Sequence, residues 1–173
     1  MAITLLRHAA LPQEFQKCYI GHSDIEIDFN LFDVEKVIEI NAKNYDLVFC
    51  SDLIRTQTTL ELLGKSFLID SRLKEVKFRD KFETMNFHEI EQHKDFDPKY
   101  LDDYLSWHDF ICEESLDDFQ TRVEDFLYHL PLKKDILICS HAGVIKMIYS
   151  ILKNINYTTL DLEVGYLDTI IIK

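Results

Sequence analysis

The sequence of 173 residues is 47% hydrophobic and 29% charged, which is typical of a soluble globular domain with a core of its own. We therefore expect a single domain, residues 1–173. The net charge of -12 argues against nucleic acid as a partner, because a groove for phosphates needs clustered Lys and Arg that the sequence lacks.

The first part of the chain alternates between strand-like and helix-like patterns. In chain order it predicts a strand at 3–6, a helix at 31–43, a strand at 46–51, a helix ending at Leu63 and a short strand at 67–70. The prediction of the first helix depends on apolar residues at helical spacing, namely Leu31, Val34, Val37 and Ile38. Asp52 is expected to cap the second helix.

The middle of the chain, residues 74–113, shows no single period over much of its length. It holds many of the aromatic residues in short helical fragments, and we interpret it as an insertion that covers one edge of the domain. Between Asp95 and Asp118 there are nine Asp or Glu residues against a single Lys. Such a run most simply indicates a solvated face, although it could also repel anionic ligands from all but one entrance.

Regular patterns return after the insertion. A helix is predicted over 115–130, where Ser115 and Asp118 resemble a capping box, and an apolar strand follows within 135–143. A helix from Gly143 to Leu152 and a last strand within 167–173 complete the chain. The alternation predicts an α/β fold in which helices flank a mainly parallel sheet.

Four cysteines without CxxC spacing predict buried free thiols, with neither a disulfide framework nor a metal site. No leader-like segment opens the sequence, and no apolar run approaches the roughly 18 residues that cross a bilayer. We therefore expect a cytoplasmic protein without a membrane partner.

Three predicted strands end in polar side chains. Arg7 and His8 follow the first strand, Ser51 and then Arg55 follow the second, and His141 follows the strand before the last helix. Each alone could be a surface residue or a helix cap. Because ligands of α/β sheets bind at the carboxyl ends of strands, together they predict an anion site. Gly143 and the small residues Ala9 and Ala142 would let the backbone pass close to a ligand.

Two Arg and two His side chains in one cavity suit phosphoryl transfer. A guanidinium group can bind two phosphate oxygens at once and spread the charge of the transition state. A neutral imidazole can attack phosphorus. Such a reaction also needs an acid that protonates the leaving alcohol. The substrate that this chemistry indicates is a phosphate ester.

Five segments, "LLRHA", "CSDLIRTQTT", "LKEVKF", "EESLDDFQTRV" and "ICSHAGVIK", occur in the order and spacing of the histidine phosphatase superfamily. The chain resembles its phosphoglycerate mutase-like branch, with alpha-ribazole phosphatases as the nearest resemblance. The resemblance covers nearly the whole chain. It implies a three-layer sandwich with a small helical cap formed by residues 74–113.

The resemblance also implies roles for individual residues. His8 would be the nucleophile that forms a phosphohistidine, and Arg7, Arg55 and His141 would bind the phosphoryl group. Glu75 matches the glutamate of the family's "LxExxFGxWEG" block, which donates the proton and later activates water. The segment "YIGHSD" resembles a region that lines the phosphate side of the pocket, so Ser23 is expected to contact substrate.

The chain departs from the family at several positions. Ala9 and Ala142 stand where the family has glycine, and "FRDKFET" replaces "FGxWEG". Ala142 is still expected at the substrate. The leading hypothesis is a phosphatase that hydrolyses a small-molecule phosphate ester and needs no cofactor and no metal. Two alternatives remain: a phosphoglycerate mutase-type transfer, and a non-catalytic descendant that binds phosphorylated ligands or proteins. The oligomeric state is not predicted.

Overall fold

A computed structural model describes residues 2–131 and 133–173 of the chain. It contains one five-stranded sheet in the order β3-β2-β4-β1-β5. The strands are β1 (Ile3–Arg7), β2 (Leu47–Cys50), β3 (Leu68–Ile69), β4 (Ile136–Ser140) and β5 (Thr169–Ile172). All pairs are parallel except β1 with β5, so the expectation of a mainly parallel sheet is confirmed.

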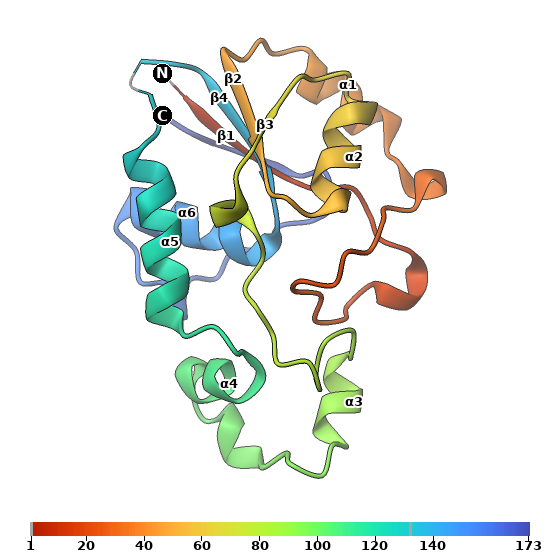
Figure 1. Ribbon diagram of the computed structural model, residues 1–173, viewed down its shortest axis with the longest axis vertical. Helices are drawn as coiled ribbons and strands as arrows, with labels where there is room; N and C mark the ends of the chain where they lie inside the picture. The colour runs from red at the N-terminus through yellow and green to blue at the C-terminus, as the bar shows by residue number, and fades with distance from the viewer. Residues whose placement is uncertain (1, 132) are drawn as a thin grey trace.

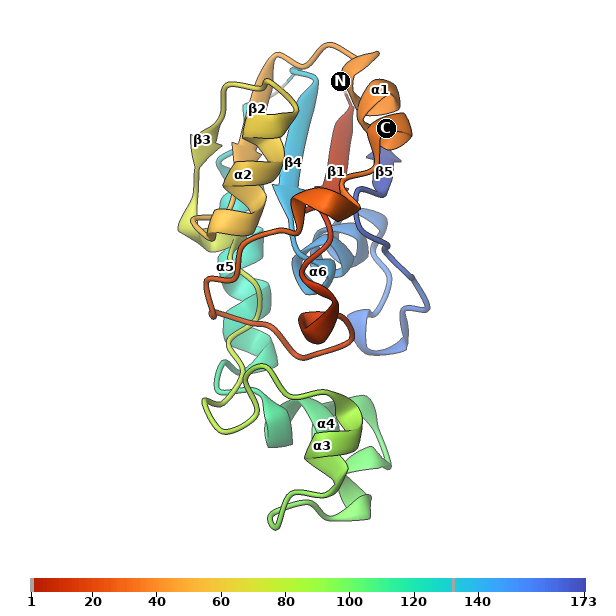
Figure 2. The same ribbon diagram turned by 90° about the vertical axis from the view of Figure 1, so that its right-hand side faces the viewer.

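Helices cover both faces of this sheet, as Figures 1 and 2 show. The helices are α1 (Val34–Asn41), α2 (Ile54–Leu62), α3 (Phe87–Glu91), α4 (Tyr104–Ile111), α5 (Leu116–Tyr128) and α6 (Ala142–Lys153). Helices α1 and α2 lie on one face, and α5 and α6 lie on the other. The predicted three-layer α/β sandwich is therefore the observed architecture.

The alternation of side chains along the strands supplies a core on each side of the sheet. In β4, Ile136 and Ile138 pack towards α5 and α6, while Leu137 and Cys139 pack towards α1 and α2. All four are fully buried. Because successive strand residues point to opposite faces, a central strand covered on both sides must be apolar throughout.

The two helices on the α1–α2 face differ from their predictions. Of the apolar stripe predicted for α1, Val34 and Ile38 are 64% and 65% exposed, whereas Val37 packs against the core, which the buried Ile40 also reaches. Asp33 caps this helix by accepting from the backbone N–H groups of the first turn. The predicted cap of α2 is wrong, because its N-cap is Leu53 and the N–H of Ile54 is bound by Asp24 instead.

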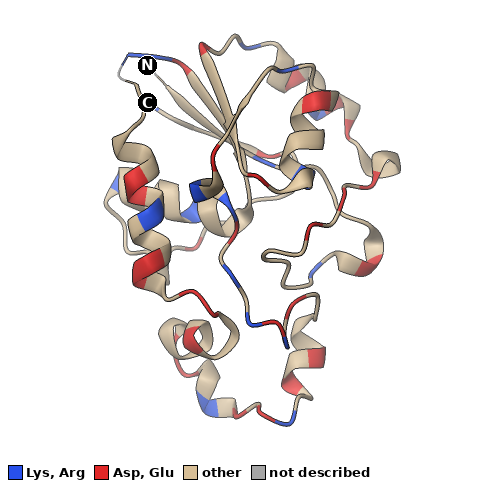
Figure 3. Ribbon diagram, in the orientation of Figure 1, with Lys and Arg blue, Asp and Glu red and all other residues tan. Residues whose placement is uncertain are grey.

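Residues 74–113 contain α3 and α4 and lie beyond the carboxyl ends of β1, β2 and β4 (Figure 1). Their aromatic side chains pack on one another, with Tyr100 stacked on Phe110 at a centroid distance of 4.2 Å. Figure 3 shows acidic residues distributed over this end of the molecule and over the outer helices.

Helix α5 begins at the predicted cap, since the Ser115 hydroxyl accepts from the N–H of Asp118. All four cysteines are free, and all but the partly exposed Cys18 are buried as predicted. None of the helices in the described residues is long and apolar enough to cross a bilayer.

Candidate active site

The carboxyl ends of β1, β2 and β4 bring the predicted polar residues to one edge of the sheet. Strand β1 ends at Arg7 and pairs in parallel with β4, so that His8 and His141 follow neighbouring strand ends. Their ring centroids are 5.2 Å apart. A cavity of about 160 Å³ opens here. Its lining includes Arg7, His8, Glu75, His141 and Ala142.

His8 is held with one ring nitrogen free. It is 4% exposed, and its Nδ1 lies 2.8 Å from the carbonyl oxygen of Ala9. A carbonyl only accepts, so Nδ1 carries the proton and Nε2 keeps its lone pair. Burial, then Arg55, then Arg7 hold the pKa of His8 well below its ordinary value. The imidazole is therefore neutral at pH 7, as a nucleophile must be.

His141 is also neutral, but both of its nitrogens are engaged. Its Nδ1 accepts from Nε of Arg55 at 3.2 Å, and its Nε2 lies 2.8 Å from Oγ of Ser51. Because Nδ1 accepts, Nε2 is the protonated nitrogen and donates to Ser51. Burial, followed by the charge of Arg55, lowers the pKa of His141 well below its ordinary value. In this arrangement His141 orients Arg55.

Arg55 is 1% exposed and is held by neutral groups. Its Nη1 donates to the carbonyl of Ser23 and its Nη2 to the carbonyl of Gly21, each at 2.8 Å. A guanidinium has five N–H donors, so these bonds fix the fork and still leave donors for an anion. Burial lowers the pKa of Arg55 to about 10, which keeps the group charged at pH 7.

Arg7 lies beside the cavity with part of its guanidinium unsatisfied. Its Nη1 donates to the carbonyl of Val164, and its guanidinium carbon lies 4.0 Å from the centre of the Tyr166 ring. Its Nε is buried and lacks a hydrogen-bond partner among the described residues. A buried guanidinium N–H without an acceptor is costly, so this nitrogen favours an incoming anion.

Neither arginine forms a salt bridge with a carboxylate in the described part of the chain. Arg55 lies within electrostatic range of Glu75, Asp24 and Glu83, but it bonds only to carbonyl groups and an imidazole. Buried charges are ordinarily paired, because removing a lone cation from water is costly. Two cations without a counter-ion around a neutral histidine are typical of an anion-binding site.

Glu75 closes the same cavity and is 8% exposed. Its carboxylate accepts from the N–H groups of Val76 and Gly143, each at 3.0 Å. A Cβ atom on residue 143 would clash with Oε1 of Glu75. Gly143 was expected to let the backbone approach a ligand, and the group it approaches here is this carboxylate.

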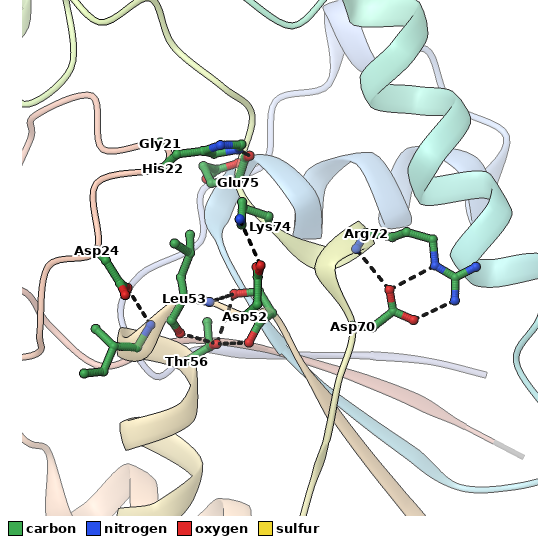
Figure 4. A network of polar contacts seen from close by, with 12 residues as sticks. Gly21, His22, Asp24, Asp52, Leu53, Thr56, Asp70, Arg72, Lys74 and Glu75 are labelled. Carbon is green, nitrogen blue, oxygen red and sulfur yellow. Dashed lines mark hydrogen bonds and ion pairs between the residues drawn. The ribbon is translucent and has the colours of Figure 1, made fainter.

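The backbone of Glu75 is held as well. Its carbonyl oxygen lies 3.0 Å from Nε2 of His22 and 3.2 Å from Nη2 of Arg122. Figure 4 shows His22 against Glu75, at the end of the segment that carries Arg72 and Lys74. His22, which belongs to the "YIGHSD" segment, supports Glu75 from outside the cavity.

Two residues at the site were not singled out by the sequence. Glu83 accepts from the N–H groups of Gly21 and Ser23 at 2.8 and 2.9 Å, and so holds the loop whose carbonyls bind Arg55. It lies in "FRDKFET", and the glutamate of the corresponding "FGxWEG" block could have pointed to it. The other residue, Tyr166, lies in the loop before β5 and stacks on Arg7, and no motif indicated it.

The predicted substrate-binding residues differ in their placement. Arg7 and His141 line the cavity, and so does Ala142, the first residue of α6. Arg55 is not among the residues that line the cavity, and it contacts the site through its bond to His141. Ser23 contributes its backbone to Arg55 and Glu83, and its side chain is not among those that line the cavity.

Among the described residues, no three His, Cys, Asp or Glu side chains are placed to hold a metal ion together. A larger hollow of about 620 Å³ lies among charged residues of the 74–113 segment, including Arg79, Lys81 and Asp95. It contains none of the residues at the strand ends.

The chain matches a known family over nearly its whole length. The model of the histidine phosphatase superfamily (branch 1) matches residues 3–172. The adenosylcobalamin/alpha-ribazole phosphatase of Escherichia coli (strain K12) is 25% identical over 161 residues, which are 86% of this chain and 77% of the relative. These names support phosphatase activity.

Solved structures share the fold. The alpha-ribazole phosphatase of Shigella flexneri superposes with a TM-score of 0.77 at 22% identity, over 100% of this chain and 90% of that one. A phosphoserine phosphatase of Entamoeba histolytica, solved with 3-phosphoglyceric acid, has a TM-score of 0.77 at 21% identity, over 98% and 89%. At such identities the likeness is one of architecture.

Proposed function

Because this chain belongs to the histidine phosphatase superfamily (branch 1), we propose that it hydrolyses small phosphomonoesters through a phosphohistidine on His8. The observation that carries the proposal is a pair of arginines that no carboxylate among the described residues pairs with, beside a neutral histidine with a free Nε2. A phosphate group would supply the missing negative charge.

In the first step Nε2 of His8 attacks phosphorus, and the bond from phosphorus to the ester oxygen breaks. Glu75 donates a proton to the departing oxygen, so the product leaves as a neutral alcohol. Arg7 and Arg55 bind the phosphoryl oxygens and stabilise the negative charge that these oxygens carry in the transition state. His141 maintains the orientation of Arg55.

In the second step water attacks the phosphohistidine. The Glu75 carboxylate takes a proton from the water as the new bond to phosphorus forms. The bond between phosphorus and Nε2 breaks, inorganic phosphate leaves, and His8 returns to its neutral form. No step requires a metal or an organic cofactor.

Hydrolysis of para-nitrophenyl phosphate in the presence of a chelator tests this proposal. We expect turnover by the wild type and none above background for His8→Ala. Acid quenching of the wild type during turnover should trap acid-labile phosphate on His8. Equal activity of wild type and His8→Ala would overturn the proposal.

The same preparations separate the two alternatives from hydrolysis. A mutase would move phosphate between the hydroxyl groups of phosphoglycerate faster than it releases phosphate. A non-catalytic descendant would bind phosphate esters with no turnover and no phosphohistidine. Either outcome would contradict the phosphatase.

A further inference from the structure

The 164–168 loop, the segment directly before β5, binds Arg7 through both the backbone and the side chain of that residue. The N–H of Leu167 donates to the carbonyl of Arg7, and the N–H of Arg7 donates to the carbonyl of Asp168, each at 3.2 Å. Nη1 of Arg7 donates to the carbonyl of Val164 at 2.6 Å. The loop therefore packs on the residue that ends β1.

The ring of Tyr166, at the centre of this loop, contacts both Arg7 and His8. The guanidinium carbon of Arg7 lies over the ring, 4.0 Å from its centroid. The imidazole of His8 lies at a centroid distance of 5.6 Å and is tilted by 52°. Tyr166 is half-buried and lines the cavity at the strand ends. One ring therefore contacts the cation and the proposed nucleophile together.

Contact with a ring holds a guanidinium while leaving its hydrogen bonds free. The cation is attracted to the π-electrons of the ring, whereas the N–H groups of a guanidinium lie in its own plane. Within the described residues, the Arg7 side chain makes one hydrogen bond, from Nη1 to Val164, and its buried Nε makes none. Arg7 therefore keeps donors for phosphoryl oxygens while the ring fixes its side chain.

The charge of Arg7 is also left uncancelled by this arrangement. Asp168 lies within electrostatic range of Arg7, but its carboxylate bonds to Lys36 and to the N–H of Gly165. A carboxylate on Arg7 would hold the side chain equally well, but it would also neutralise the charge that attracts an anion. The ring holds the cation without that cost.

The backbone that presents Tyr166 is fixed from helix α1. Nζ of Lys36 donates to the carbonyl of Tyr166 at 2.9 Å and pairs with Oδ1 of Asp168 at 2.6 Å. Oδ2 of Asp168 accepts from the N–H of Gly165 at 2.7 Å. The buried Leu167 has a φ of 57°, a left-handed conformation that is costly for a residue with a side chain. These contacts hold the loop in one strained shape.

We propose that Tyr166 is a positioning residue: its ring holds the Arg7 guanidinium beside His8 with N–H donors free for the phosphoryl group. The inference rests on the proposed phosphatase activity and adds a residue that acts through Arg7. The ring carries this effect and the phenol does not, because the hydroxyl of Tyr166 forms no hydrogen bond to any residue that the structure describes.

Two substitutions at Tyr166 separate the ring from its hydroxyl. Tyr166→Leu removes the ring, and it should lower kcat/KM for para-nitrophenyl phosphate by about tenfold and raise Kd for inorganic phosphate by a similar factor. Tyr166→Phe keeps the ring, so both values should stay within about twofold of the wild type. Tyr128→Leu makes the same change at a tyrosine that is 85% exposed, and it should alter neither value.

A double variant tests whether Tyr166 acts through Arg7. In an Arg7→Ala background no guanidinium remains to be held, so adding Tyr166→Leu should change the Kd for inorganic phosphate by less than about twofold. Isothermal titration calorimetry measures this Kd for the wild type, both single variants and the double variant. Losses that multiply in the double variant would contradict the proposal.

Lys36→Met tests the same link with the ring left unchanged. It removes the bond to the carbonyl of Tyr166, so it should raise the Kd for inorganic phosphate by about threefold or more. The result is informative even if Tyr166→Leu does not fold. Lys43→Met replaces an exposed lysine that follows α1, and it should leave the Kd unchanged. An unchanged Kd for Lys36→Met would contradict the role of the loop.

The outcomes separate this inference from the function on which it rests. Turnover by the wild type no higher than that of His8→Ala would overturn the phosphatase, while the phosphate Kd values would still test Tyr166. Wild-type kcat/KM and Kd for Tyr166→Leu would overturn the inference alone. Equal losses for Tyr166→Phe and Tyr166→Leu would assign the effect to the hydroxyl and also overturn it.

Discussion

At the scale of single residues, the site combines groups that are held in one protonation state or one orientation. The Ala9 carbonyl selects the tautomer of His8, and the Nε–H donor of Arg55 selects that of His141. Glu75 is fixed through both its carboxylate and its carbonyl oxygen. Such preorganisation lowers the cost of forming the transition state, because few groups need to move during the reaction.

Replacing the proposed acid separates substrates by their leaving groups. Glu75→Gln should lower kcat/KM for alkyl phosphates by roughly 10² to 10⁴-fold, because an alkoxide departs slowly without a proton. Para-nitrophenolate needs little protonation, so its ester should lose less than about tenfold in the first, phosphorylating step. Steady-state kinetics on both esters check this, and equal losses would remove Glu75 from the role of acid.

A substitution at Arg55 tests whether the planar guanidinium is needed or whether a positive charge is enough. Arg55→Lys keeps the positive charge but loses the bonds to His141, Ser23 and Gly21. We expect kcat/KM to fall by about 10²-fold, as for loss of a transition-state donor. Arg79→Lys makes the same change outside the site as the control. Near-normal activity of Arg55→Lys would show that Arg55 does not bind the phosphoryl group.

At the scale of elements, much of the sheet could be predicted because buried strands are apolar on both faces. The ends of β1, β2 and β4 were also predictable, since parallel strands place their carboxyl ends at one edge. Helix α1 shows the limit. Its apolar stripe is largely exposed, because hydrophobic spacing indicates a helix but not which face meets the sheet.

Contacts made by loops could not be predicted from local patterns. Tyr166 reaches Arg7 because the chain turns back after α6 and enters β5 antiparallel to β1. The prediction that Asp52 caps α2 was wrong for the same reason, since Asp24 in a distant loop accepts from the N–H of Ile54. Such contacts depend on the tertiary structure, so the spacing of residues along the chain does not predict them.

The loop at residues 21–23 gives a prediction at this scale. Glu83→Ala removes the acceptor for two backbone N–H groups and frees the carbonyls that hold Arg55. We expect kcat/KM to fall by about tenfold or more and Tm to fall by about 4–8 °C, from a loss of about 2 kcal/mol. Kinetics and thermal unfolding measure the two effects.

Two further variants decide whether Glu83 acts as a positioning residue. Glu83→Gln keeps a carbonyl oxygen that can accept both bonds, so it should restore most of the activity. Glu124→Ala removes an exposed carboxylate from α5 and should leave both Tm and activity unchanged. If Glu83→Ala lowers Tm while kcat/KM stays normal, the loop supports stability and not Arg55.

At the scale of the whole molecule, the site couples ionisation to folding. His8 and His141 are neutral and buried between the sheet and the segments that cover its carboxyl edge, beside Arg7 and Arg55. Unfolding exposes both imidazoles to water, where they bind protons with an ordinary pKa near 6.5. Folding and protonation of these two residues therefore oppose each other.

The sign of the pH dependence follows from this opposition. Above about pH 6.5 both states hold neutral imidazoles, whereas below it the unfolded chain binds protons that the folded chain excludes. The free energy of unfolding should fall by up to about 1.4 kcal/mol per pH unit for each histidine as the pH is lowered. Asp70 and Asp168 titrate below this window, since bonds to Arg72 and Lys36 lower their pKa values.

Urea unfolding of the wild type and His8→Ala between about pH 7.5 and 5.5 measures this dependence. The variant should lose about half of the slope that the two histidines contribute together. Parallel curves for the two proteins would show that His8 takes up protons equally in both states.

The position of Gly143 has a meaning for other sequences of this fold. Its missing side chain leaves the volume that Oε1 of Glu75 occupies, and the N–H of the same residue binds that carboxylate. A sequence with a side chain at this position could fold, since a carboxylate can swing aside, but it could not keep an acid in this place. The two positions therefore form a pair that can be checked together: a glycine here leaves room for the glutamate that we propose as the proton donor, and a larger residue displaces its carboxylate.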